Sequence, residues 1–161
     1  MVILVMGVAG SGKTTIGLEL ARELKWTFID ADDVHPPANI QKMAAGQPLT
    51  DEDRAPWLAA LRARIDECLA REENAIVTCS ALKERYRAAL IGDPSKVKVV
   101  FLHGSPELLR SRISGRAGHF MPPALLASQL AALEPPSNAL QLDISRSPAE
   151  LITTIREALR I

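Results

Sequence analysis

Residues 7–15 read Gly7-Val8-Ala9-Gly10-Ser11-Gly12-Lys13-Thr14-Thr15 and directly follow the apolar run Val2–Met6. The stretch fits G-x-x-x-x-G-K-[ST], the pattern of a loop that binds nucleotide phosphates. Its glycines let the backbone curl until N–H groups point at phosphate oxygens. The lysine brings a positive charge to the β- and γ-phosphates, and the threonine after it offers a hydroxyl to Mg²⁺. With a strand before it and a helix after it, the stretch predicts a nucleotide phosphate site.

Composition limits what else the chain can be. It has 161 residues, 47% hydrophobic and 24% charged, with a formal net charge of zero. We expect one soluble domain over residues 1–161, and no nucleic-acid or membrane partner because no basic block stands out. The two cysteines lack metal-ligand spacing, which favours a reduced protein. The apolar start is too short for a signal peptide or a membrane span, so a cytoplasmic location is expected.

Short apolar runs alternate with longer helical patterns, which predicts an α/β fold with a mainly parallel sheet. Strands are expected at Val2–Met6, Trp26–Ile29, Ala75–Cys79, Val97–Leu102 and Leu140–Asp143. Helices are expected over residues 13–24, 37–44, 50–69, 82–90, 105–114, 123–133 and from 147 onward. Thr50 and Asp53 have the spacing of a capping box at the start of the long helix. Neither a linker nor a repeat divides the chain.

In an open parallel sheet, ligands bind beyond the carboxyl ends of the strands. Asp30 and Asp32 follow the second strand and alternate along an extended segment, so both can face the phosphate loop if the strand bends or ends there. One carboxylate would hold Mg²⁺, and the other would orient, or deprotonate, an attacking hydroxyl. The alternative is a solvated acidic turn. His35, beside two prolines, either contacts a ligand or packs in the turn.

Two basic groups complete the candidate site. Lys83 and Arg87 lie four residues apart behind the third strand, where a shared helical face would receive a carboxylate or phosphate of the second substrate. Arg110, Arg112 and Arg116 lie near Gly115 and Gly118, a composition typical of a lid that closes over a transferring phosphoryl group. Solvated basic helix faces are the alternative for both groups.

Longer strings of sequence resemble one known family. They are Phe28–Met43, which includes Asp30-Ala31-Asp32-Asp33 and His35-Pro36-Pro37, then Pro48–Arg54 with Pro56-Trp57-Leu58, Cys79–Lys83 with Tyr86-Arg87, Arg116–Pro122, and Leu133–Pro136. Together with the phosphate loop, and in this order, they resemble the gluconokinases, the thermoresistant gluconate kinase family of P-loop kinases. The resemblance runs from the loop to Pro136.

The resemblance implies ATP-dependent phosphorylation of the 6-hydroxyl of D-gluconate, giving 6-phosphogluconate. It also implies a three-layer P-loop kinase fold with a five-stranded parallel sheet, a small helical lid around residues 110–135, Mg²⁺ dependence and a homodimer. ATP would bind Gly7, Ala9, Gly10, Ser11, Gly12, Lys13, Thr14, Thr15, Arg112 and Arg116, with Thr14 and Asp30 at the metal. The catalytic group would comprise Lys13, Asp30, Asp32, Arg112 and Arg116. The sugar acid would bind Asp32, His35, Arg54, Lys83, Arg87 and His119.

The chain departs from this family at two positions. Ala31 stands where many relatives have glycine between the acidic residues, and this change is conformationally mild. Ala117 stands where many have lysine or glutamate before Gly-His-Phe, so a lid charge is absent and lid closure or the use of ATP is expected to differ.

Two rival functions share the phosphate loop. A shikimate kinase also has Asp-x-Asp after its second strand, but the strings at residues 79–83 and 118–122 favour gluconate. A nucleotide-dependent switch would need no small second substrate. The guanine-specific N-K-x-D string is absent, and an acidic cluster facing a basic group suits a phosphoryl acceptor better.

Overall fold

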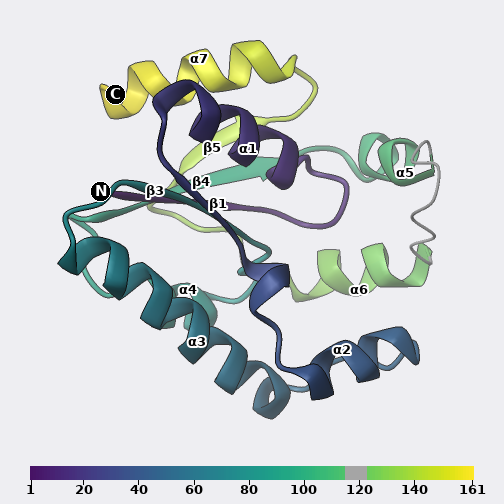
Figure 1. The fold of residues 1–161 in the computed structure, drawn as a ribbon. Coiled ribbons are helices and arrows are strands. Elements are labelled where there is room, and N and C mark those ends of the chain that lie inside the picture. The colour runs from purple at the N-terminus through teal and green to yellow at the C-terminus, as the bar shows by residue number, and fades with distance from the viewer. Residues whose placement is uncertain (115–122) are drawn as a thin grey trace.

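The computed structural model describes residues 1–114 and 123–161. Five strands form one parallel sheet in the order β2-β3-β1-β4-β5 (Figure 1). Their bounds are β1 Val2–Met6, β2 Thr27–Asp30, β3 Ala75–Cys79, β4 Val97–His103 and β5 Leu140–Asp143. All five expected strands are present, with the ends of two displaced by one residue. The α/β fold with a five-stranded parallel sheet is confirmed.

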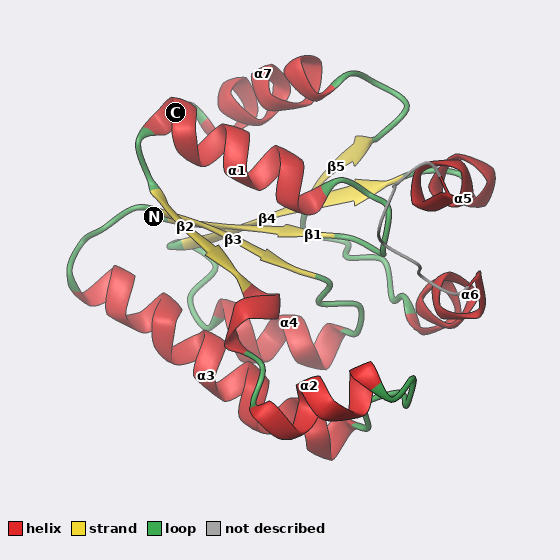
Figure 2. Cartoon of the chain, turned by 45° about the vertical axis from the view of Figure 1, so that its right-hand side comes forward, coloured by secondary structure: helices red, strands yellow, loops and turns green. Residues whose placement is uncertain are grey.

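Helices cover both faces of the sheet (Figure 2). Their bounds are α1 Lys13–Leu24, α2 Pro37–Ala44, α3 Asp51–Ala70, α4 Glu84–Ile91, α5 Pro106–Ser114, α6 Pro123–Ala132 and α7 Pro148–Leu159. Helices α1 and α7 lie on one face, and α3 and α4 lie on the other (Figure 1). Among the described residues, no helix combines the length and apolar character needed to cross a membrane.

The central strand, β1, is covered by helices on both faces of the sheet. All five residues of β1 are buried, because a helical layer covers each face and parallel strands flank both edges. Its alternate residues belong to two separate apolar cores: Leu4 packs with Trp57 and Leu61 of α3, and Ile3 packs on the side of α1 and α7. Burial on both faces places the phosphate loop at the carboxyl end of a rigid strand.

Local signals locate the helix starts. Thr50 and Asp53 form the expected capping box: the Thr50 hydroxyl accepts from the Asp53 N–H, and the Asp53 carboxylate accepts from the Thr50 N–H. Ser147 and Glu150 form a second box at α7. The Ser105 hydroxyl accepts from the Leu108 N–H at the start of α5, as its position before Pro106 predicts.

The second strand ends at Asp30, which is the condition under which Asp30 and Asp32 can both face the phosphate loop. Asp30 and Asp32 do not alternate along an extended segment, because the chain turns into a 3₁₀ helix, η1, over Ala31–Val34. The Asp30 carboxylate accepts a hydrogen bond from the Asp32 N–H at 3.1 Å and so caps this helix. A carboxylate that caps its own neighbour favours a turn over continued strand. The turn brings both carboxylates to the end of the sheet nearest the phosphate loop.

Gly17 is the point where α1 lies closest to the sheet, and it yields a stability prediction. A Cβ atom there would lie 2.5 Å from Thr78 Cγ2 and 3.0 Å from Phe28 Cε2. Gly17→Ala is therefore expected to lower the free energy of unfolding by roughly 1–3 kcal/mol, despite alanine's better helix propensity. Urea unfolding measures it. The control is Leu18→Ala, an exposed position on the same helix, where a change within about 0.5 kcal/mol is expected. Equal stability of Gly17→Ala and wild type would contradict the packing argument.

Candidate functional site

The phosphate loop connects β1 to α1 and has the conformation that its glycines permit. Gly10 and Gly12 have φ angles of 78° and 88°, in the left-handed region that other residues avoid. Helix α5 packs directly on the loop, since a Cβ at Gly10 would lie 3.0 Å from the Leu109 carbonyl oxygen. Any side chain at this position would clash, so the close contact between loop and α5 depends on glycine.

Lys13 and Thr14 lie where the motif predicts. Lys13 Nζ donates a hydrogen bond to the Val8 carbonyl at 3.0 Å, so the ammonium group folds over the loop. Thr14 Oγ1 donates to Asp30 Oδ2 at 3.3 Å. A hydroxyl and a carboxylate thus face each other beside the phosphate loop, and oxygen donors of these two kinds are the ligands that Mg²⁺ prefers. The predicted metal pair is brought together.

Asp32 lies near the same point, and its environment raises its pKa. Asp32 is exposed at the surface, and desolvation by the surrounding protein is the largest cause of the raised pKa; the neighbouring Asp30 carboxylate is the second, while Lys13 and His35 oppose both. A carboxyl group with a raised pKa is a better proton acceptor once ionised. Asp32 is thus a basic group within the electrostatic reach of the lysine that would hold the γ-phosphate.

The turn after β2 is held by α3. Trp57 Nε1 donates to the Ala31 carbonyl at 2.7 Å, and the His35 ring stacks on Trp57 with centroids 4.3 Å apart. Asn39 Nδ2 lies 3.4 Å from His35 Nδ1. Partial burial lowers the pKa of His35, and the nearby Arg54 lowers it further, while Asp32 opposes both. His35 therefore packs in the turn, which was one of its two predicted roles, and also lies beside Asp32.

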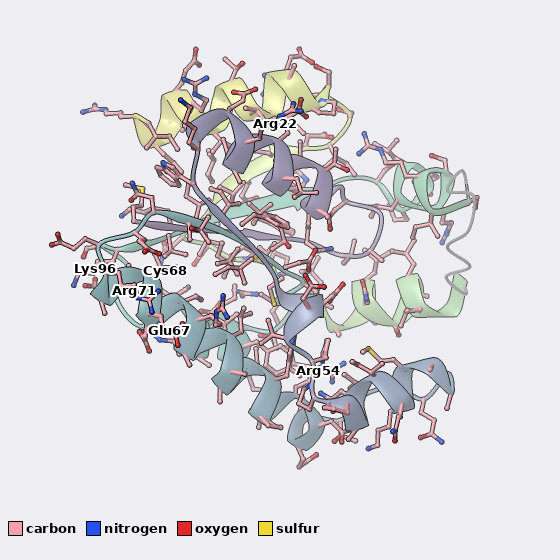
Figure 3. The ribbon with its side chains drawn as sticks, in the orientation of Figure 1. Arg22, Arg54, Glu67, Cys68, Arg71 and Lys96 are labelled. Carbon is pink, nitrogen blue, oxygen red and sulfur yellow. The ribbon has the colours of Figure 1, made fainter. Side chains whose placement is uncertain are left out.

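A basic cluster lies at the start of α3 and α4, and we define it as Arg54, Lys83 and Arg85. All three cations lie 5.5–5.8 Å from the centre of the Tyr86 ring. The Asp51 carboxylate accepts hydrogen bonds from Lys83 (3.4 Å), Arg85 and the Tyr86 hydroxyl. Figure 3 labels Arg54 at the end of α3 that approaches α2. Three positive charges against one carboxylate leave the cluster with a net positive charge.

Asp51 gives a pH-dependent stability prediction. The Tyr86 hydroxyl and the Arg85 guanidinium lower its pKa from 3.8 to about 2. A depressed folded-state pKa stabilises the fold above the unfolded pKa and loses that effect as the pH falls through the folded value. The urea midpoint of Asp51→Asn is therefore expected to lie below that of wild type at neutral pH, with the gap closing from about pH 4 toward about pH 2. The control is Glu52→Gln in the same turn, and a gap that stays constant across this window would refute the assignment.

The structure corrects the expectation for Arg87. Its side chain is fully buried, and its guanidinium donates to the carbonyls of Ala81 and Leu82 at 3.0 and 3.1 Å and to the Glu84 carboxylate. Lys83 precedes α4 as its N-cap residue, so the two side chains do not share a helical face. Arg87 thus braces the segment after β3, where Ala81 has a positive φ of 43°, and its buried guanidinium is directed at these carbonyls and at Glu84.

Arg112 reaches the phosphate loop from α5. Its Nη1 lies 3.8 Å from where a Cβ on Gly12 would be, and its Nη2 donates to the Ile144 carbonyl at 2.5 Å. The guanidinium is therefore held beside the loop, as expected of an arginine that contacts phosphates. Arg116 and His119, with Ala117, lie outside the described residues.

Several residues of this region escaped the sequence interpretation. Gln129 of α6 accepts a hydrogen bond from the Ala9 N–H at 2.7 Å, which ties α6 to the phosphate loop. The Glu134 carboxylate accepts from the Glu84 N–H at 2.6 Å at the start of α4. A motif string contained Glu134, but nothing local predicts either partner, because the contacts span 120 and 50 residues of chain.

Two further observations delimit the site. A cavity of about 420 Å³ lies between α4 and the start of β4, lined in part by Ala88, Ile91 and Val97, and no phosphate-loop residue lines it. Within residues 1–114 and 123–161, no three His, Cys, Asp or Glu side chains are grouped as a metal site.

Comparisons with known proteins agree with this geometry. A family model described as an AAA domain matches residues 2–136. The chain is 49% identical over 136 residues to a gluconokinase of Gluconobacter oxydans, covering 84% of this chain and 76% of the relative. It is 43% identical to the thermosensitive gluconokinase of Escherichia coli K12, covering 96% and 85% of the two chains. A crystal structure of a gluconokinase from Sinorhizobium meliloti superposes with a TM-score of 0.84, at 43% identity over 98% and 94% of the chains.

The rival kinase family is more distant. A shikimate kinase from Aquifex aeolicus is 20% identical with a TM-score of 0.58, which indicates a shared fold alone. By contrast, identities above 40% extend across nearly the whole chain and include the loop and the acidic turn that form the site. The chain belongs to the gluconokinase family of P-loop kinases.

Proposed function

We propose that this protein transfers the γ-phosphoryl group of ATP to the 6-hydroxyl of D-gluconate, giving 6-phospho-D-gluconate and ADP. The observation that carries the proposal is the juxtaposition of three features at one edge of the sheet. They are the phosphate loop with Lys13, the acidic turn with Asp30 and Asp32, and the basic cluster behind it. Family membership supports the choice of gluconate, since relatives of 43–49% identity over most of the chain are named gluconokinases.

The nucleotide side would be served by the loop. Backbone N–H groups of the loop, the dipole of α1 and Lys13 would hold the phosphates, and Arg112 would add charge from α5. Thr14 and Asp30 would hold Mg²⁺, which when bound neutralises charge that develops on the β- and γ-phosphate oxygens. Because phosphoryl transfer asks little covalent chemistry of the protein, these groups would act by positioning and electrostatics.

The acceptor side would be served by Asp32 and the basic cluster. Asp32 would accept a hydrogen bond from the 6-hydroxyl, orient its oxygen toward the γ-phosphorus and take its proton as the new P–O bond forms. The cluster of Arg54, Lys83 and Arg85 would hold the carboxylate at the other end of the sugar acid, with charge-assisted hydrogen bonds. His35 would contact a hydroxyl in between. Arg116 and His119 remain predicted contacts.

Three further properties belong to the same proposal. The chain would act as a single kinase domain whose lid, around residues 110–135, closes over the phosphates. It would work in the cytoplasm, which the two free, buried cysteines support, since reduced thiols are typical of that compartment. It would be a homodimer, as the family resemblance implies.

A coupled assay of ADP release tests the reaction. Purified protein with Mg²⁺ and ATP is given D-gluconate, shikimate or D-sorbitol, which has a sugar chain like that of gluconate but no carboxylate. Strong release with gluconate and little with sorbitol is expected, because of these two only gluconate has a carboxylate that the basic cluster can hold. Release with shikimate in place of gluconate would overturn the proposed acceptor. Nucleotide binding without release for any acceptor would favour the nucleotide switch.

A further inference from the structure

We propose that Trp57 is a positioning residue for phosphoryl transfer. It fixes the position of the Asp32 carboxylate relative to the His35 imidazole, and Asn39 determines which ring nitrogen of His35 carries the proton. The roles of Asp32 and His35 rest on the proposed function. The arrangement itself rests on contacts within the described residues.

The first contact joins Trp57 to the segment that carries the two carboxylates. Trp57 is 4% exposed, and its Nε1–H donates to the Ala31 carbonyl at 2.7 Å. Ala31, itself 1% exposed, lies between Asp30 and Asp32. A buried hydrogen bond at this point fixes the peptide plane from which Asp32 extends. Since α3 is anchored in the core through Leu58 and Leu61, the indole transmits the position of a rigid helix to this turn.

The second contact joins the same side chain to His35. The two rings are stacked with an interplanar angle of 8° and centroids 4.3 Å apart. Trp57 therefore holds both sides of η1 at once: the peptide before Asp32 by a hydrogen bond, and the residue after the helix by ring stacking. Neither contact alone would define the distance between carboxylate and imidazole.

Asn39 decides which nitrogen of His35 carries the proton. Asn39 is 3% exposed, and its Nδ2 donates to the Asp53 carbonyl at 2.9 Å. A carbonyl accepts only, so the atom facing it is the amide nitrogen. The same NH₂ group faces His35 Nδ1 at 3.4 Å, and an NH₂ group has no acceptor capacity. Nδ1 must then be the unprotonated acceptor, and the neutral ring carries its proton on Nε2.

The acceptor side of the site therefore offers one hydrogen-bond acceptor and one hydrogen-bond donor to the substrate. Asp32 offers an acceptor to the reacting hydroxyl, and His35 offers an N–H donor to a second oxygen of a polyhydroxylated substrate. Transfer is sensitive to such placement, because a displacement of about 1 Å at the reacting atoms costs about a hundredfold in rate. Trp57 would thus influence kcat and the KM of the acceptor without touching the nucleotide.

Trp57→Phe tests this directly, because phenylalanine keeps a stacking ring and removes the N–H donor. We expect kcat to fall by about tenfold and the KM for gluconate to rise, with the KM for ATP unchanged within about twofold. The matched control is Ile65→Ala, a buried residue of the same helix and core that makes no contact of this kind. It is expected to lower the melting temperature but to leave both KM values and kcat within about twofold at temperatures where the variant is folded.

Two results would overturn the proposal. One is a Trp57→Phe variant with kcat and gluconate KM unchanged, and the other is an Ile65→Ala variant with the same kinetic loss, which would show that general destabilisation is sufficient. Nitrogen NMR on wild-type protein supplies a test that needs no turnover. The chain has three histidines, and His35→Gln assigns the signal. A protonated Nε2 with an unprotonated Nδ1 at neutral pH is expected, and the opposite tautomer would refute the role of Asn39. Failure of wild type to phosphorylate gluconate would refute the proposed function while leaving this tautomer result standing.

Discussion

Replacing Lys13 by alanine is expected to lower kcat for gluconate phosphorylation by about 10²–10³-fold, as removal of a donor to developing transition-state charge does elsewhere. The ammonium group already folds over the phosphate loop, with Nζ 3.0 Å from the Val8 carbonyl, so it needs little movement to meet the β- and γ-phosphates. The loss should be the same for every acceptor, because the proposed role of Lys13 is on the nucleotide alone. ADP release at saturating gluconate measures it, and calorimetry with ATP shows how much of the loss is binding.

Lys96→Ala is the matched control for this charge removal. Lys96 is exposed in the turn before β4, at the far end of the sheet from the phosphate loop (Figure 3). Lys96→Ala removes the same positive charge from a residue that has no contact with the site, so its kcat is expected to equal that of wild type. Full activity of Lys13→Ala would contradict the assignment of the loop as the phosphate site.

Asp32→Asn is expected to lower kcat by about 10²-fold or more while changing the affinity for ATP by less than about twofold. The amide is nearly isosteric with the carboxylate but cannot take a proton. The raised pKa of Asp32, caused by desolvation and by Asp30, makes the carboxylate more basic than an ordinary aspartate. Steady-state kinetics with gluconate and calorimetry with ATP separate the two effects.

The neighbouring Asp33 provides the control. It is an exposed residue of the same short helix, so Asp33→Asn removes one negative charge at nearly the same place. The kcat of Asp33→Asn is expected to stay within about threefold of wild type, since Asp33 has no proposed contact with the acceptor hydroxyl. Unchanged gluconate turnover in Asp32→Asn would remove this residue from the mechanism. A parallel loss of ATP affinity would instead move it to the nucleotide side.

Much of the fold follows from rules that operate over a few residues. The glycines and Lys13 of the phosphate loop, the capping box of Thr50 and Asp53, and the buried strands all follow from local geometry or from a periodic apolar pattern. The order of the strands after the loop also indicated which polar residues would gather at one edge. The phosphate site was therefore predictable, and the pairing of Thr14 with Asp30 agrees with it.

The arrangement of residues on the acceptor side could not be predicted from the sequence, because it depends on contacts between distant parts of the chain. Arg87 was expected on a shared face with Lys83, yet Lys83 precedes the helix and the buried Arg87 guanidinium bonds to backbone carbonyls. The Asp51 carboxylate at the start of α3 bonds to residues more than 30 positions later. Propensity and capping rules describe a helix end without specifying what packs against it.

The sequence by itself determined the α/β class, the phosphate loop and the family, because motif residues act through backbone conformation and spacing that are local. Only the tertiary structure decided that Trp57 joins Ala31 to His35, that Asn39 orients the ring, and that Arg112 lies beside Gly12. Those contacts form when separate elements pack on the two faces of one sheet. Their distances depend on the packing of the whole core, which no window of sequence contains.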